Sequence, residues 1–152
     1  RCNRQGRSHS RGLIAVNTFY LEILSPERVF YRGECVSIVM PTGDGMLGIM
    51  ANHAPLCASI EDGEVVFTKP DGETVICAVM RGIADMTDNH LHLLCESALA
   101  PDEIDAEAER RLADEAEKEM RNKQSEHDFA IWQMTFKNAM NRLRVKGKSG
   151  IN

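Results

Sequence analysis

The stretch PTGDGMLGIMANHAPL, residues 41–56, decides how this chain is interpreted. Gly43, Gly45 and Gly48 spell G-x-G-x-x-G, the pattern that in dinucleotide-binding domains ends a strand and opens a helix whose N-terminal amides hold a pyrophosphate. No helix can follow here, because only three apolar residues precede an Asn-His-Ala-Pro sequence and proline removes an amide donor. The stretch instead predicts a glycine-containing turn, a short apolar strand and a His-Ala-Pro-Leu corner.

The first half of the chain, from Thr18 to about Ala98, has the alternating pattern of short, half-buried β-strands. Apolar side chains recur at every second position in three runs: Val65 and Phe67; Val75, Cys77 and Val79; Leu91, Leu93 and Cys95. Residues that favour tight or left-handed turns precede the first run at 61–63 and separate the following runs at 70–72 and 87–89. Many short strands with regular turn signals predict an antiparallel β-sandwich or flattened barrel.

The second half changes to helical spacing at Pro101, where a proline followed by acids is a helix-opening signal. The first predicted helix has a thin, alanine-rich stripe: Ile104, Ala108, Leu112, Ala116 and Met120. A second helix follows the capping-box-like sequence 125–128 and has a larger stripe: Phe129, Trp132, Phe136, Met140 and Leu143. The chain is therefore expected to end in an antiparallel two-helix hairpin. Because alanine buries little area, the first helix is predicted to dock weakly on the sandwich.

Charge separates the two predicted helices. Residues 101–120 carry nine acids and three bases, whereas residues 129–152 carry five bases and no acid. Clustered bases can bind nucleic acid, but the net charge of −5 for the whole chain disfavours that function. Two interpretations stay open: the second helix pairs with the acidic first helix, or it attracts a protein partner with an acidic surface.

The five cysteines form no C-x-x-C pair, and their odd number argues against a disulfide framework or a zinc site: Cys2, Cys35, Cys57, Cys77 and Cys95. We expect reduced thiols of a cytosolic protein, most of them buried. Cys57 is expected to be buried because it lies in a predicted apolar strand.

His53 with Cys57 and Asp62 could suggest a thiol nucleophile activated by a base and oriented by a carboxylate. A turn histidine whose ring nitrogen bonds a backbone carbonyl fits this sequence better. His90 and His92 share one strand face, but no third metal ligand accompanies them. The sequence therefore predicts no catalytic residue and no metal site.

Seven segments of the chain, taken in order, resemble the epsilon subunit family of bacterial F-type ATP synthases. They are the loop at 41–56 together with FYLEILSPERVF (19–30), GECV (33–36), RGIA (81–84), LLCESA (93–98), EID (103–105) and AMNRL (139–143). The resemblance covers about residues 17–146. It implies a noncatalytic central-stalk subunit of a proton- or sodium-driven rotary ATP synthase, which couples rotation to ATP synthesis.

The resemblance also implies partners for both parts of the chain. In this family the β-sandwich binds the gamma subunit and touches the c ring, so the candidate contact residues here are Asp44, Gly45, Met46, Leu47, Gly48 and His53. Met46 stands where many members have an acid, so apolar contact is expected to replace an ion pair. The helical hairpin is implied to inhibit ATP hydrolysis by contacting the catalytic alpha and beta subunits through Lys137, Arg142 and Arg144.

Some bacterial members bind ATP through an Ile/Leu-Asp-x-x-Arg-Ala motif on the first helix and two arginines on the second. Asp105 matches the motif and Arg142 matches one arginine, whereas Ala108 and Asn138 stand where two cations would be. Each lost cation removes charge-assisted hydrogen bonds of about 1.5–3 kcal/mol to a triphosphate. ATP binding through Asp105 and Arg142 is therefore expected to be weak or absent, and no cofactor is expected.

The expected domains are a β-sandwich at 17–99 and a helical hairpin at 100–147, followed by a tail at 148–152. Residues 1–16 are expected to be a disordered leader or expression-derived segment. No apolar run approaches the roughly 18 residues of a membrane span, so membrane association is expected only through the complex, at the cytoplasmic face of the bacterial plasma membrane. A free nucleotide-sensing module, or a helical-hairpin adaptor without a rotary partner, is the alternative.

Overall fold

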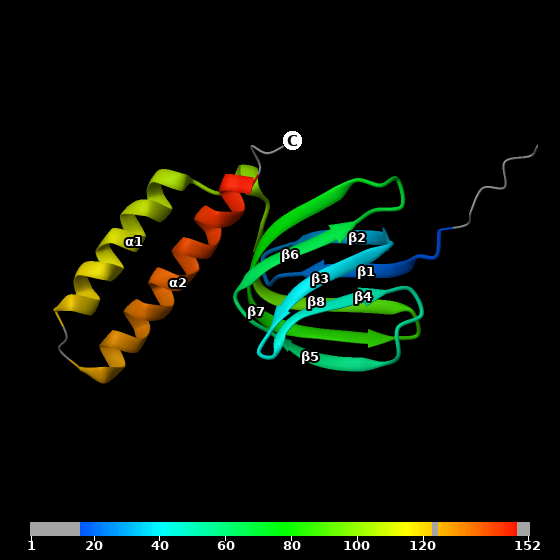
Figure 1. Ribbon diagram of the computed structural model, residues 1–152, viewed down its shortest axis with the longest axis horizontal. Helices are drawn as coiled ribbons and strands as arrows, with labels where there is room; N and C mark the ends of the chain where they lie inside the picture. Colours follow the sequence, from blue (N-terminus) through cyan, green and yellow to red (C-terminus); the bar gives the residue numbers. More distant parts are fainter. Residues whose placement is uncertain (1–15, 123–124, 149–152) are drawn as a thin grey trace, which may run out of the picture.

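The computed structural model describes residues 16–122 and 125–148, which form a β-sandwich followed by two helices (Figure 1). The strands are β1 (Phe19–Leu24), β2 (Val29–Cys35), β3 (Ser37–Thr42), β4 (Gly45–Met50), β5 (Leu56–Ile60), β6 (Gly63–Thr68), β7 (Thr74–Thr87) and β8 (His90–Leu99). The helical segments are η1 (Pro101–Glu103), α1 (Ala106–Arg121) and α2 (Glu126–Lys148). Of the predicted leader at 1–16, residues 1–15 lie outside the described residues, as do residues 149–152 of the predicted tail at 148–152. Lys148, predicted to begin the tail, is the last residue of α2.

The strands follow one another in the order β2-β1-β8-β7-β5-β3-β4, and β6 pairs with both β3 and β7, which closes the sheet over its core. The predicted antiparallel arrangement is confirmed for every described pair of strands except one, because β1 runs parallel to β8. Tight turns impose antiparallel pairing on neighbouring strands. β1 and β8 are far apart in the sequence, so no turn fixes their relative direction.

The core of the sandwich is built from the inward positions that the alternation predicts. Val65 and Phe67 are buried on β6, and Leu91 and Leu93 are buried on β8 beside His90, which faces outward. Each fully buried side chain of this size contributes about 1.5–3 kcal/mol relative to exposure. The predicted alternation is therefore confirmed on β6 and β8. On β7, Cys77 and Val79 are buried as predicted, but Ala78 between them is buried as well, because it packs with Ile104 and Val145.

The glycine-rich stretch at 41–56 forms a hairpin. β3 and β4 pair antiparallel from Ser37 opposite Met50 to Thr42 opposite Gly45, and no helix follows β4. Gly45 has a φ of +123°, a value in the left-handed region that L side chains rarely adopt. The exclusion of a dinucleotide-binding loop is confirmed.

The first helix begins later than the sequence predicted. Pro101 opens the short 3-10 turn η1, and α1 starts only at Ala106. The Asp105 side chain caps α1 by accepting from the backbone N–H groups of Glu107 at 3.0 Å and Ala108 at 3.1 Å. Because a capping aspartate requires an extended backbone at its own position, the α-helix cannot start upstream of Asp105.

The helical hairpin packs differently from the predicted stripes. In α1 the buried residues are Ala113 and Ala116, and in α2 they include Ala139 and Val145. Met140, predicted to lie in the apolar stripe, is 46% exposed. Figure 1 shows α2 between α1 and β7, and α2 makes most of the hairpin's contacts with the sandwich. The sequence predicted weak docking of the first helix on the sandwich, and the structure adds that α2, not α1, makes the main contact, while Ala113 and Ala116 of α1 are buried within the helical part.

The cysteines confirm one expectation and correct another. Cys35, Cys77 and Cys95 are buried free thiols, as expected, whereas Cys2 lies outside the described residues. Cys57 is exposed, so the prediction that it is buried is wrong. On β5 the inward position is taken by Ile60, and Cys57 falls on the outward face of the alternation.

Candidate interaction surfaces

The turn between β3 and β4 presents Asp44 and Gly45 to solvent. Thr42 stabilises the turn, because its hydroxyl donates to the carbonyl of Gly45 at 2.7 Å. The side chain of Asp44 has no hydrogen bond or ion pair among the described residues and is exposed. This turn is therefore a well-formed projection that a partner can contact.

β4 is an edge strand that pairs only with β3 among the described strands. Its outward positions are unusually apolar, with Met46 61% exposed and Met50 63% exposed, and Gly48 lies between them without a side chain. Leu47 is partly buried and packs against the core. Of the candidate contact residues on this strand, Met46 and Gly48 therefore lie on the surface, while Leu47 mainly supports them.

His53 lies at the opposite end of β4 from Asp44, roughly 20 Å away along the strand. Its Nδ1 atom is 2.8 Å from the carbonyl oxygen of Ala54, as the sequence interpretation of a turn histidine expected. Asp62 accepts instead from the backbone N–H of Arg81 at 2.7 Å. The structure therefore does not bring His53 next to Asp44, nor does it join His53 and Asp62 into a nucleophile-activating group.

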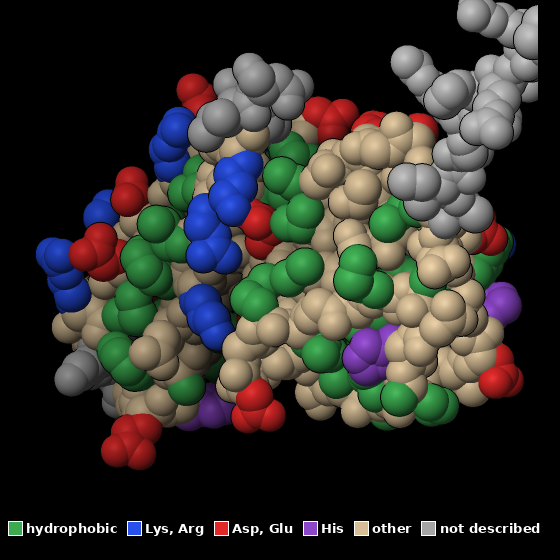
Figure 2. All heavy atoms as spheres, turned by 45° about the vertical axis from the view of Figure 1, so that its right-hand side comes forward, with side chains coloured by type: hydrophobic (Ala, Val, Ile, Leu, Met, Phe, Trp, Pro, Cys, Tyr) green, Lys and Arg blue, Asp and Glu red, His purple; other side chains and the backbone are tan. Residues whose placement is uncertain are grey.

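Two basic residues of α2, Lys137 and Arg144, lie seven positions apart and so share one helix face. They line a groove of about 1340 Å³ between α2 and the turn that follows β5, together with Met134 and Met140. Figure 2 shows Lys and Arg side chains aligned along the junction of helices and sandwich, next to hydrophobic side chains. Both cations are exposed and have no ion-pair partner among the described residues.

Arg142 faces a different direction from these two cations. Its guanidinium forms an ion pair with Glu109 of α1 at 2.9 Å and lies 3.2 Å from the sulfur of Met80. Only 22% of the Arg142 side chain is exposed. The sequence grouped Lys137, Arg142 and Arg144 as one surface, but the structure places Arg142 at the inter-helix contact, away from the other two.

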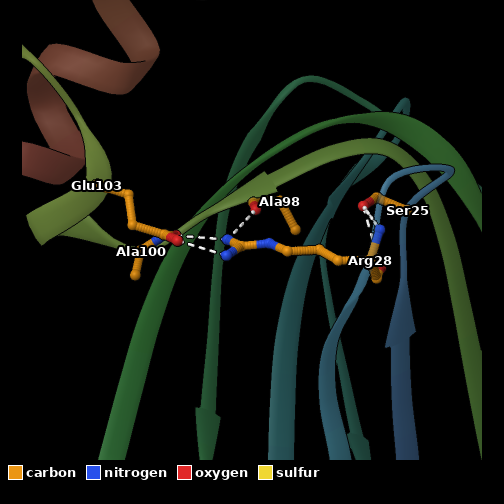
Figure 3. A network of polar contacts seen from close by, with 5 residues as sticks. All are labelled: Ser25, Arg28, Ala98, Ala100 and Glu103. Carbon is orange, nitrogen blue, oxygen red and sulfur yellow. Dashed lines mark hydrogen bonds and ion pairs between the residues drawn. The ribbon is translucent and has the colours of Figure 1, made fainter.

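Three further contacts join the helical segments η1 and α2 to the sandwich, and sequence reasoning missed all of them. The Asn141 side chain is buried and donates to the Gly63 carbonyl at 3.1 Å. Lys148 pairs with Glu64 at 2.8 Å. Arg28 pairs with Glu103, joining the β1–β2 turn to η1 (Figure 3). An isolated Asn or Arg in a sequence carries no periodic signal, so these pairs could not be predicted.

Two further findings concern the part of the chain that the structure describes, residues 16–122 and 125–148. No group of three or more metal-ligating side chains occurs there. His92 Nδ1 instead lies 2.8 Å from a carboxylate oxygen of Glu22. Over the same residues, neither helix is apolar enough along its length to cross a bilayer.

Comparison with protein families covers both parts of the chain. Residues 18–101 match the model described as ATP synthase, Delta/Epsilon chain, beta-sandwich domain, and residues 102–147 match the corresponding long alpha-helix domain. The chain belongs to the ATP synthase delta/epsilon family. The resemblance seen in the sequence is confirmed, and the alternative of a free module or adaptor is not favoured.

Bacterial members of the family align with this chain over nearly their whole length. The ATP synthase epsilon chain of Syntrophomonas wolfei is 34% identical over 89% of this chain and 98% of its own. The epsilon chain of Caldanaerobacter subterraneus is 30% identical over 86% of this chain and 95% of its own. A chain of the Euglena gracilis mitochondrial ATP synthase has the same fold, with a TM-score of 0.75 at 15% identity over 99% of this chain and 91% of its own.

Within this delta/epsilon fold, the two candidate nucleotide-binding residues already have structural roles. Asp105 caps α1, and the backbone N–H groups of Ala108 and Glu107 lower the pKa of its carboxyl group. Arg142 forms an ion pair with Glu109. The second carboxylate oxygen of Glu109 is buried without a hydrogen-bond partner in the described structure. A triphosphate would have to compete with this carboxylate for Arg142.

Proposed function

We propose that this chain is a noncatalytic central-stalk subunit that couples rotation to ATP synthesis and restrains ATP hydrolysis through its C-terminal helices. The strongest support is that both parts of the chain match the family while α2 presents two exposed cations. The sandwich has a large packed core and suits transmission of torque. The hairpin makes few contacts with the sandwich, so it can move and inhibit ATP hydrolysis.

The surface proposed for the gamma subunit and the c ring is the β3–β4 turn with the outward side of β4. Asp44 and Gly45 project from a braced turn, and Met46 adds an exposed apolar side chain. Met46 and Met50 are both exposed on the same side of β4, and contiguous exposed apolar patches mark interaction sites. His53 contributes only if the partner extends along the whole edge strand, because it lies at the other end of β4.

The contact proposed for the brake is between α2 and acidic surface of the catalytic alpha and beta subunits. Lys137 and Arg144 are exposed and attract such a surface over roughly a Debye length of 8–10 Å. Arg142 joins them only after it leaves Glu109, so we assign it a smaller part. This proposal requires no bound nucleotide. It is supported by the contacts of Asp105, which caps α1, and of Arg142, which pairs with Glu109.

We also propose that the chain is a peripheral protein at the cytoplasmic face of a bacterial membrane, held there by the rotary complex. The support is that the relatives described above with the highest identity are bacterial epsilon chains. Proton- and sodium-driven complexes both fit this placement. Fractionation of native membranes tests it, because a complex-bound chain sediments with membranes and is released when the catalytic head is stripped off.

The test of the brake is ATP hydrolysis by the assembled catalytic head across ATP concentrations. A chain truncated after Asp105 keeps the sandwich and the Arg28–Glu103 pair but lacks both helices. We expect assembly to persist and the hydrolysis rate to rise. Lys137→Ala combined with Arg144→Ala is expected to give a smaller rise, since each lost contact of about 1 kcal/mol shifts the blocked state roughly five-fold.

The matched control removes two cations from α1 instead. Arg110 and Lys118 are exposed and have no ion pair among the described residues. Replacing both by alanine changes the net charge equally but leaves α2 intact. An equal rise in the control would show that bulk charge, and not the α2 surface, governs hydrolysis; an unchanged rate after truncation would refute the brake.

A further inference from the structure

Two contacts between an arginine and a methionine join β7 to α2 in the described part of the chain, and they run in opposite directions. Arg81 of β7 directs its Nη1 atom toward the sulfur of Met134 on α2, at 3.8 Å. Arg142 of α2 directs its Nη2 atom toward the sulfur of Met80 on β7, at 3.2 Å. A thioether sulfur is a weak hydrogen-bond acceptor. Each contact therefore places a charged donor beside an acceptor that binds it weakly.

The two sulfurs differ in their access to solvent. Met134 is 40% exposed and lies on the wall of the groove between α2 and the turn that follows β5. Met80 is partly buried, and the Arg142 guanidinium against its sulfur is itself mostly buried. A reagent dissolved in water therefore reaches Met134 more easily than Met80.

The guanidinium of Arg81 is oriented by contacts on its other side. Its Nε atom donates to a carboxylate oxygen of Glu96 at 2.7 Å, and the backbone N–H of Arg81 donates to Asp62 at 2.7 Å. A guanidinium carries five N–H donors in one plane, so Arg81 can bind Glu96 and still turn Nη1 toward Met134. A charged donor is therefore already in place beside an accessible sulfur.

Oxidation of methionine changes what its side chain can accept. Hydrogen peroxide transfers one oxygen atom to the thioether: the sulfur gives an electron pair to the new S–O bond, the O–O bond breaks, and the peroxide is reduced to water. The product is a sulfoxide, whose oxygen is polar. This oxygen accepts a hydrogen bond more strongly than the thioether sulfur does, and a charged donor strengthens the bond further.

We propose that Met134 is a site of reversible oxidation by peroxides and that Arg81 binds the oxygen of the resulting sulfoxide. Oxidation then strengthens the contact between α2 and β7, whereas a sulfoxide without a donor disrupts packing. A methionine sulfoxide reductase reverses the change: a dithiol is oxidised to a disulfide, and the oxygen leaves as water. The modification alters ATP hydrolysis only if the hairpin acts as the proposed brake, but the site itself is tested in the full chain alone.

The first measurement locates the oxidised residues. All eight methionines of the chain lie among the described residues, and the exposed ones are Met46, Met50, Met134 and Met140. The substitutions Met46→Leu, Met50→Leu and Met140→Leu leave Met134 as the exposed methionine. After treatment with hydrogen peroxide, mass spectrometry of peptides is expected to find one added oxygen on Met134, while the fully buried Met40 and Met86 stay unmodified.

The second measurement compares hydrogen exchange of the α2 amides before and after oxidation of this chain. Oxidation is expected to slow their exchange roughly five-fold, the size of one added hydrogen bond. With Arg81→Ala added, the same oxidation is expected to speed exchange, because the sulfoxide then lacks its donor. Glu96→Gln is the control for this substitution, since it breaks the Arg81–Glu96 ion pair but keeps the guanidinium. Treatment with the reductase is expected to reverse the slowing.

Met140 provides a matched methionine on the same helix. It is 46% exposed and lines the same groove, and its sulfur has no hydrogen bond among the residues that the structure describes. A chain with Met46→Leu, Met50→Leu and Met134→Leu keeps Met140 as its exposed methionine. Oxidation of this chain is expected not to slow the exchange of α2.

Each outcome supports or overturns a stated part of the proposal. An unmodified Met134 would overturn the oxidation site. Slowing that persists with Arg81→Ala, is lost with Glu96→Gln or occurs equally at Met140 would overturn Arg81 as the group that binds the sulfoxide. If truncation after Asp105 left ATP hydrolysis unchanged while the exchange results held, the brake would be refuted and the oxidation site would stand.

Discussion

The sandwich and the hairpin are stabilised in different ways. The sandwich closes over large side chains with almost no exposure, such as Phe19, Phe67 and Leu93. The hairpin has alanines at its inter-helix contact and meets the sandwich through a buried amide, an ion pair, contacts of arginines with Met80 and Met134, and a small apolar cluster. Burial of large apolar groups dominates stability. The difference suggests one cooperative platform carrying an element that can separate from it without unfolding.

The largest effect that tests this comparison is expected from Phe67→Ala. Phe67 is 1% exposed, and its ring centre lies 4.6 Å from that of Tyr31 across the core. Removing a buried aromatic side chain costs about 3–5 kcal/mol, so the denaturation midpoint of the whole sandwich is expected to fall. Chemical denaturation followed by circular dichroism measures this change.

Phe136→Ala in α2 is the matched substitution in the hairpin. Phe136 is half-buried, so its loss is expected to lower only the protection of helical amides from hydrogen exchange. If both substitutions shift one common transition by the same amount, the two regions are a single cooperative unit and the comparison is wrong.

The sequence predicts features that depend on neighbouring residues, and it does not predict contacts between segments that are far apart in the chain. Alternation is local, so the buried faces of β6 and β8 could be read directly. In β5 the residues Cys-Ala-Ser do not alternate between apolar and polar side chains, so the sequence does not show which face is buried. The prediction that Cys57 lies on the buried face is therefore wrong. The parallel pairing of β1 with β8 joins distant segments, and no local pattern encodes it.

The candidate sites show the same division. The turn at Asp44 could be predicted because turn residues are a local feature, whereas the edge position of β4, which leaves Met46 exposed, depends on the order of strands in the sheet. The partner of Arg142 could not, because it depends on the relative register of two helices, and that register places Glu109 opposite it. The register between α1 and α2 thus decides which cations of α2 reach the surface.

An intermediate effect is expected from enlarging the contact between the helices with Ala116→Leu. Ala116 is fully buried, and overpacking a closely packed position costs about 1–3 kcal/mol. The helices are expected to separate and the Arg142–Glu109 pair to loosen, with no change in the sandwich. Hydrogen exchange resolved by segment measures both parts at once.

Ala106→Leu serves as the control for added bulk, because Ala106 is at the start of α1 and only partly buried. It is expected to leave the exchange of α2 unchanged. Loss of protection in the strands of the sandwich after Ala116→Leu would contradict the independence of the two regions.

The smallest effect is expected from acid. The side chain of Arg28 and the backbone N–H of Ala100 hold the pKa of Glu103 below its ordinary value of 4.5. A carboxyl group whose pKa is lower in the folded state stabilises that state above its unfolded pKa, and this contribution is lost as pH falls through the folded pKa. Both partners are substantially exposed, so solvent screening keeps the contribution small. The difference in unfolding free energy between the wild-type chain and Glu103→Gln should therefore be constant near neutral pH and shrink below pH 4.5. Denaturation curves from about pH 6 to about pH 3 test this dependence. A difference that grew on acidification would show that the Arg28–Glu103 ion pair does not stabilise the fold through the Glu103 carboxylate.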